Sequence, residues 1–83
     1  MTYKITRTSP ASTRILSFEY ATLADARAFL SEIRQSFADE APRGMKRERA
    51  RWSDDCRSII CEETNDADPR GRGDKYVYTI FKA

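Results

Sequence analysis

The sequence predicts an α+β fold in which one amphipathic helix packs on one face of a small, four-stranded antiparallel sheet. Apolar residues recur at helical spacing through a single stretch, 22–37, whereas several other stretches alternate apolar and polar residues as strands do. The expected order is β-β-α, a basic segment, and β-β. A chain of 83 residues is of a size for one domain, spanning 1–83.

The helix is expected over residues 22–37. Its apolar residues form a single stripe at 3.6 residues per turn: Ala26, Phe29, Leu30, Ile33 and Phe37. Thr22 supplies an N-cap oxygen and Asp25 supplies a first-turn carboxylate, which together satisfy free N–H groups and suit the helix dipole. Pro42 limits the other end, because the residue before a proline avoids helical backbone angles.

Alternation predicts strands at residues 3–8, 14–20, 57–63 and 75–81. The first two are expected to pair as an antiparallel hairpin, and residues 53–55 and 64–74 read as a turn and a loop. The last three strands carry apolar groups on both faces, but one helix covers only one face. The second face is therefore expected to meet the basic segment, a second copy of the chain in a homodimer, or a different partner.

The basic segment, residues 43–51, holds five positive charges and one negative charge and is followed by Trp52. If it is extended, alternation places Arg47, Arg49 and Arg51 on one face and Trp52 on the other. Such a surface suits phosphates or an acidic protein. The alternative is a solvated loop with Trp52 in the core. The candidate binding residues are Arg43, Lys46, Arg47, Arg49, Arg51 and Trp52.

Catalytic chemistry is not expected. The sequence has no His, which removes the commonest general base near neutral pH and the usual nitrogen ligand of zinc. Its three glycines match no phosphate-binding pattern. We therefore expect no catalytic residues, no metal, no cofactor and no enzyme activity.

The chain shows no stretch of the roughly 18 apolar residues that a membrane span needs, nor an apolar signal region near its start. Cys56 and Cys61 are expected to be unpaired, which fits a reducing compartment. We therefore expect a cytoplasmic protein with no membrane contact, located in the host cytoplasm if it is encoded by a phage.

The junction Phe18-Glu19-Tyr20-Ala21-Thr22-Leu23-Ala24-Asp25-Ala26, a strand that runs into a capped amphipathic helix after a short hairpin, resembles that of small phage or mobile-element proteins. Among these, the chain is most similar in build to single-domain anti-CRISPR proteins. The resemblance covers the layout of the whole length and no diagnostic motif, so it carries over no functional residues. It implies a non-catalytic inhibitor that docks on a CRISPR effector complex and blocks target DNA binding or nuclease recruitment.

Two further interpretations concern nucleic acids. The alternative function is a small nucleic-acid-binding protein that uses the basic segment together with Tyr76 and Tyr78, which could stack on bases or else cover the helix. A local acidic patch that imitates DNA would instead draw on Asp54, Asp55, Glu62, Glu63, Asp66 and Asp68.

Overall fold

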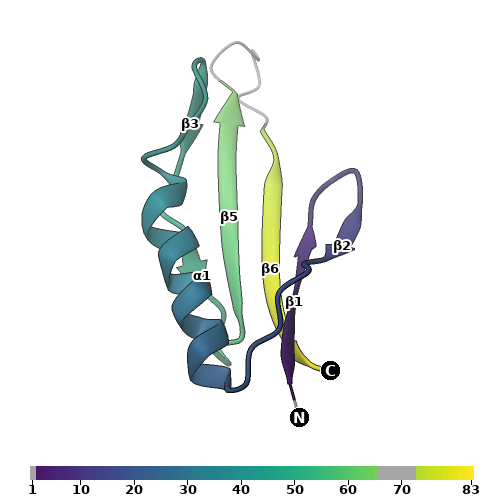
Figure 1. The fold of residues 1–83 in the computed structure, drawn as a ribbon. Coiled ribbons are helices and arrows are strands. Elements are labelled where there is room, and N and C mark those ends of the chain that lie inside the picture. Colours follow the sequence, from purple (N-terminus) through teal and green to yellow (C-terminus); the bar gives the residue numbers. More distant parts are fainter. Residues whose placement is uncertain (1, 66–72) are drawn as a thin grey trace.

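A computed structural model describes residues 2–65 and 73–83 of the chain. In chain order the elements are β1 (Tyr3–Thr8), β2 (Thr13–Ile15), α1 (Leu23–Phe37), β3 (Met45–Arg47), β4 (Arg51–Trp52), β5 (Ser58–Asn65) and β6 (Lys75–Lys82). All strand pairs are antiparallel, in the order β2-β1-β6-β5-β3, and β4 also pairs with β5 (Figure 1). The α+β class is confirmed. The sheet has six strands where the sequence predicts four, because the basic segment adds β3 and β4 along one edge of β5.

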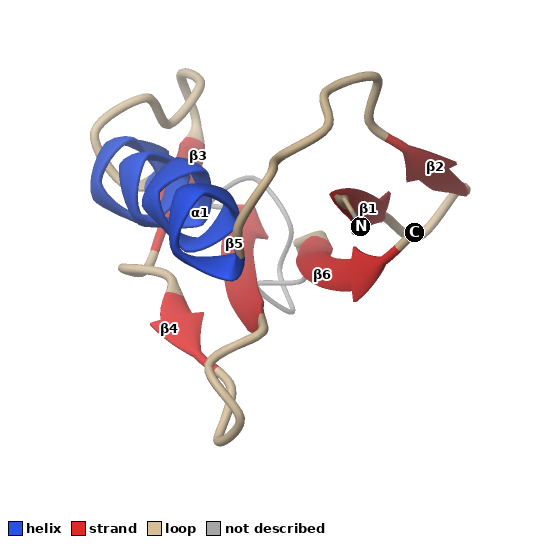
Figure 2. Cartoon of the chain, turned by 60° about the horizontal axis from the view of Figure 1, so that its bottom comes forward, coloured by secondary structure: helices blue, strands red, loops and turns tan. Residues whose placement is uncertain are grey.

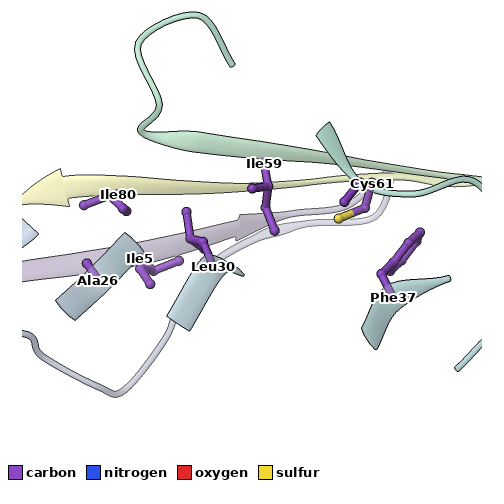
Figure 3. Close-up of a cluster of buried hydrophobic side chains, with 8 residues drawn as sticks. Ile5, Ala26, Leu30, Phe37, Ile59, Cys61 and Ile80 are labelled. Atoms are coloured by element: carbon purple, nitrogen blue, oxygen red, sulfur yellow. The ribbon is translucent and has the colours of Figure 1, made fainter. Parts of the chain in front are cut away.

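The helix lies where its apolar stripe and its cap predict. The hydroxyl of Thr22 accepts a hydrogen bond from the backbone N–H of Asp25 at 3.1 Å, so the first turn is capped. Ala26, Leu30 and Phe37 point from α1 towards the sheet and are buried there (Figure 3). Opposite them the sheet contributes four buried residues to the same cluster: Ile5, Ile59, Cys61 and Ile80.

The β1–β2 hairpin forms as expected, but its second strand is shorter than the predicted 14–20. Leu16 donates its N–H to the carbonyl of Ile5 at 2.8 Å, and Tyr20 exchanges two hydrogen bonds with Tyr3. The chain takes four steps from Leu16 to Tyr20 against two steps from Ile5 to Tyr3, so two extra residues must leave the ladder. This outward bend carries Phe18 into solvent, where 63% of it is exposed.

A second irregularity explains why the arginines of the basic segment do not share a face. Arg47 pairs with Glu63 in β3, whereas Arg51 pairs with Ile60 in β4. The chain takes four steps from Arg47 to Arg51, but their partners in β5 are only three steps apart. One extra residue therefore lies between β3 and β4. A slip of one residue reverses the faces. Arg47 and Trp52 therefore lie on the helix side of the sheet and Arg51 on the other, so the predicted shared face is wrong.

The sheet face opposite α1 is not covered by any described residue, and the basic segment runs along an edge of the sheet instead of across this face. The face mixes hydroxyl side chains with the half-buried Ile60, Val77 and Phe81. A homodimer through it stays a prediction. Within residues 2–65 and 73–83, no helix has the length and hydropathy that a membrane crossing requires.

Candidate docking site

Arg47 of the basic segment is bound to its own chain. Its Nε donates to a carboxylate oxygen of Glu63 at 2.7 Å, and the two side chains are only 17% and 5% exposed. Its Nη1 donates to the carbonyls of Phe37 and Glu40, at 3.2 and 3.4 Å, where α1 ends. The guanidinium carbon also lies 4.3 Å from the centre of the Phe37 ring. These contacts tie the end of α1 to β5, so Arg47 is a structural residue and offers little charge to a partner.

The remaining candidates of the segment are divided between surfaces. Arg51 lies on the face opposite α1, where its Nη2 donates to Glu62 at 3.2 Å, and both of these side chains are well exposed. Arg43 and Arg49 are exposed, as is Lys46. Trp52 is half-buried on the helix side and packs against the core. The structure does not bring the predicted binding residues together into one surface.

Tyr76 and Tyr78 lie on the helix side of β6, which agrees with the interpretation that they cover the helix. The Tyr76 ring meets the ring of Phe37 edge-on, with centres 6.2 Å apart. Burial is the main cause that raises the pKa of Tyr76, and its hydrogen bond to Asp74 acts in the same direction. Neither tyrosine stands on an open sheet face, where bases could stack in sequence.

The expected acidic patch is also dispersed. Glu63 is buried against Arg47, and Glu62 lies on the opposite face in its pair with Arg51. Asp55 sits in the turn before β5, where the hydrogen bond from the Ser53 hydroxyl is the main cause that lowers its pKa. Asp66 and Asp68 lie outside the described residues.

Two arginines outside the predicted binding residues form a cluster on β1 and β2, at the opposite edge of the sheet from β3. Arg7 in β1 and Arg14 in β2 are direct partners across the strand pair, on the helix side. Arg7 is half-buried, with its Nε 3.1 Å from the hydroxyl of Tyr78 and its guanidinium carbon 4.8 Å from the centre of the Tyr76 ring. No described carboxylate lies within ion-pair distance of either arginine. Like charges in direct opposition are unfavourable in a sheet, so this arrangement favours an external anion.

An apolar groove of about 380 Å³ lies beside these two arginines. Phe29 and Ile33 of α1, Tyr78 of β6 and the bend after β2 line it. The bend contributes Phe18, whose ring centre is 6.5 Å from that of Phe29. Ile15, also on the lining, is 62% exposed, and it and Phe18 are the large apolar side chains that stay exposed among the described residues. We call this hollow, with Arg7 and Arg14, the β2 groove.

The sequence carries only a weak signal for the β2 groove. Arg7 and Arg14 flank the predicted turn 9–13, and they become direct partners once the register that joins Ser9 to Ser12 is known. The exposure of Phe18 does not follow, because strict alternation places it with Leu16 and Tyr20 on one face of an unbroken strand. Figure 2 shows β2 at the rim of the sheet farthest from α1, with the connecting loop arching from β2 to the start of the helix.

No protein-family model, curated protein or solved structure matches this chain.

Proposed function

We propose that this chain is a non-catalytic binding protein that docks on a larger protein through the β2 groove. One observation carries the proposal: the exposed Phe18 flanks a groove whose two arginines have no carboxylate partner among the described residues. Protein interfaces characteristically combine a buried aromatic anchor with arginine.

The partner that we propose is a CRISPR effector complex, whose binding to target DNA the docked chain blocks. Support for this partner comes from the layout resemblance, a capped helix that follows a short hairpin, and from the docking surface described above. The hairpin and the capped helix are present in the structure. The basic segment is not the main contact surface in this proposal, because Arg47 and Arg51 are engaged by Glu63 and Glu62.

The test measures target DNA binding by a panel of purified effector–guide complexes, using fluorescence anisotropy of labelled DNA. Adding the chain is expected to prevent DNA binding by at least one complex. Phe18→Ser is expected to abolish the inhibition, whereas the matched surface variant Arg49→Glu retains it. Both variants are checked for native folding by circular dichroism. If no complex binds the chain, the CRISPR assignment fails, and if Arg49→Glu alone loses inhibition, the docking surface is the basic segment.

Direct nucleic-acid binding, the alternative function, has less support because Tyr76 and Tyr78 pack on the helix side. The same labelled DNA, mixed with the chain alone at low salt, tests it. Binding that weakens steeply as the salt concentration rises would favour this alternative.

A further inference from the structure

We infer that the β2 groove accepts an extended, acidic segment of a partner protein, which pairs with the free edge of β2 and places a carboxylate on Arg14 and Arg7. The inference rests on the proposed function, which it deepens by naming the chemistry of the bound segment. Three observations lead to it: the charge of the site, the orientation of the edge, and the position of the apolar lining.

The charge of the site selects an anion. Arg7 is half-buried, and its Nε is engaged by Tyr78, but neither of its terminal nitrogens meets an acceptor in residues 2–65 or 73–83. The side chain of Arg14, directly opposite, has neither a hydrogen bond nor an ion pair within the same residues. A planar guanidinium presents paired donors that match the two oxygens of a carboxylate. One carboxylate between the two arginines would relieve their mutual repulsion.

The edge of β2 can receive a strand. The hydrogen bonds from Leu16 to Ile5 and from Ser9 to Ser12 fix which pairs of the hairpin bond directly. Since such pairs alternate in an antiparallel ladder, Arg14 bonds inward to Arg7, and the N–H and C=O groups of Thr13 and Ile15 point away from β1. No other described strand pairs with this side of β2. An added strand would satisfy these groups, as in other cases of β-augmentation.

The lining then sets the side-chain pattern of the segment. A residue opposite Arg14 on the added strand lies on the helix side, so a glutamate there meets the two arginines. The side chain two residues along lies on the same side and faces the groove beside Phe18 and Phe29. The segment is therefore an acidic residue and a bulky apolar residue separated by one position.

The charge of the site disfavours a second copy of this chain that pairs at Arg14. Two copies of β2 paired antiparallel and centred on Arg14 would place that residue opposite itself, beside the Arg7 of each copy. Four guanidinium groups would then meet without a carboxylate among the described residues around them. The charge of the site therefore favours a different, acidic chain over self-association.

The probe for the test is an acetylated, amidated heptapeptide, Thr-Glu-Thr-Phe-Thr-Glu-Thr, in which alternate positions place both glutamates and the phenylalanine on one face. Binding is followed by backbone amide shifts of the isotope-labelled chain up to about 5 mM peptide, a range that detects even millimolar dissociation constants. The control peptide replaces both glutamates by lysine. Saturable shifts in β2 and in the bend after it, with the acidic peptide alone, are expected.

Charge-neutral variants measure separately what Arg14 and Arg7 contribute to peptide binding. Arg14→Gln and Arg7→Gln are each expected to weaken peptide binding on the order of tenfold or more, since each removes a hydrogen bond between two charged groups. Arg43→Gln, an exposed arginine just before β3 at the opposite edge of the sheet, serves as the matched control and should leave binding unchanged. Equal affinity for the lysine peptide, shifts confined to the basic segment, or no shifts at all would overturn the inference.

The outcomes also distinguish this inference from the proposed function. An effector complex that is inhibited by the Arg7→Gln and Arg14→Gln variants but not by Phe18→Ser leaves the docking function in place and removes the acidic segment. Peptide binding without inhibition of any effector supports the acidic segment and removes the CRISPR partner. A concentration-dependent dimer of the chain, abolished by Ile15→Pro because proline removes an outward N–H of the edge, would show that a second copy occupies the edge and would overturn the inference.

Discussion

Removal of the Arg47 guanidinium is expected to destabilise the fold instead of removing a binding contact. In Arg47→Met the long apolar stem is kept, while Glu63, 5% exposed, loses its 2.7 Å partner and two carbonyls at the end of α1 lose a donor. Breaking a buried ion pair by deleting one partner costs about 3–5 kcal/mol. A domain of 83 residues has a total stability of about 4–12 kcal/mol, so this loss is a large share of it.

Urea denaturation followed by the fluorescence of Trp52 measures this loss. A change of about 3 kcal/mol lowers the midpoint by about 1–3 M for a small domain. The matched control is Arg49→Met, whose exposed parent side chain should matter by less than about 0.5 kcal/mol. The double variant Arg47→Met with Glu63→Leu should recover much of the stability, because it removes both buried charges together. A loss below about 1 kcal/mol in Arg47→Met would refute the reasoning, since the pair would then behave as an exposed one.

Three further predictions concern the helix cap and the cysteines. Thr22→Ala should cost about 1 kcal/mol and lower the melting temperature by several degrees, whereas Thr22→Ser should retain the cap; equal melting of the two would contradict it. Iodoacetamide at pH 8 should alkylate the exposed Cys56 and spare the buried Cys61, as mass spectrometry of the intact folded chain would show. Burial raises the pKa of Cys61 to about 11 from 9.0, against the opposing charges of Arg47 and Arg7. The folded state therefore holds this proton more tightly, and its contribution to stability, complete below pH 9, falls by up to about 1.4 kcal/mol per pH unit between pH 9 and 11. Cys61→Ala should remove this part of the slope in denaturation series across that range, and an unchanged slope would contradict the assignment.

Local sequence signals predicted most of the regular elements. The stripe from Ala26 to Phe37, with Thr22 as cap, depends only on side chains a few positions apart; the helix begins directly after that cap and ends with the stripe. The long strands at Tyr3–Thr8 and Lys75–Lys82 likewise follow their own alternation closely. In these segments the local preference and the tertiary packing favour the same structure.

Two departures from a regular ladder account for what the sequence did not predict. The extra residue between Arg47 and Arg51 turns their side chains to opposite faces, and the two extra residues near Phe18 move that ring out of the strand. Both departures depend on which residues of the neighbouring strand pair with the segment, and the alternation of apolar and polar residues within the segment does not determine that pairing. The predicted binding residues are divided between surfaces for the same reason. Charge density along the sequence predicts a binding surface in the basic segment, whereas the partner of each arginine depends on the register of the sheet.

The pair formed by Arg7 and Arg14 shows the same point. Each is an ordinary arginine in an alternating strand, and only their direct opposition distinguishes them from the other basic residues of the chain. The number of basic residues in a segment therefore says little about binding. What matters is which of these residues lack a carboxylate partner within the chain. In the described residues, Arg47 is neutralised by Glu63, while Arg7 has aromatic neighbours and no carboxylate.

Amide hydrogen exchange in the presence of saturating acidic heptapeptide tests most directly where the chain binds. The account predicts that the N–H groups of Thr13 and Ile15, which face outward from the edge strand β2, exchange at least about tenfold more slowly when the peptide is bound. Amides of β3 and β4 should be unaffected. Protection that appears along Met45–Trp52 while Thr13 and Ile15 stay unprotected would contradict the account and return the docking surface to the basic segment.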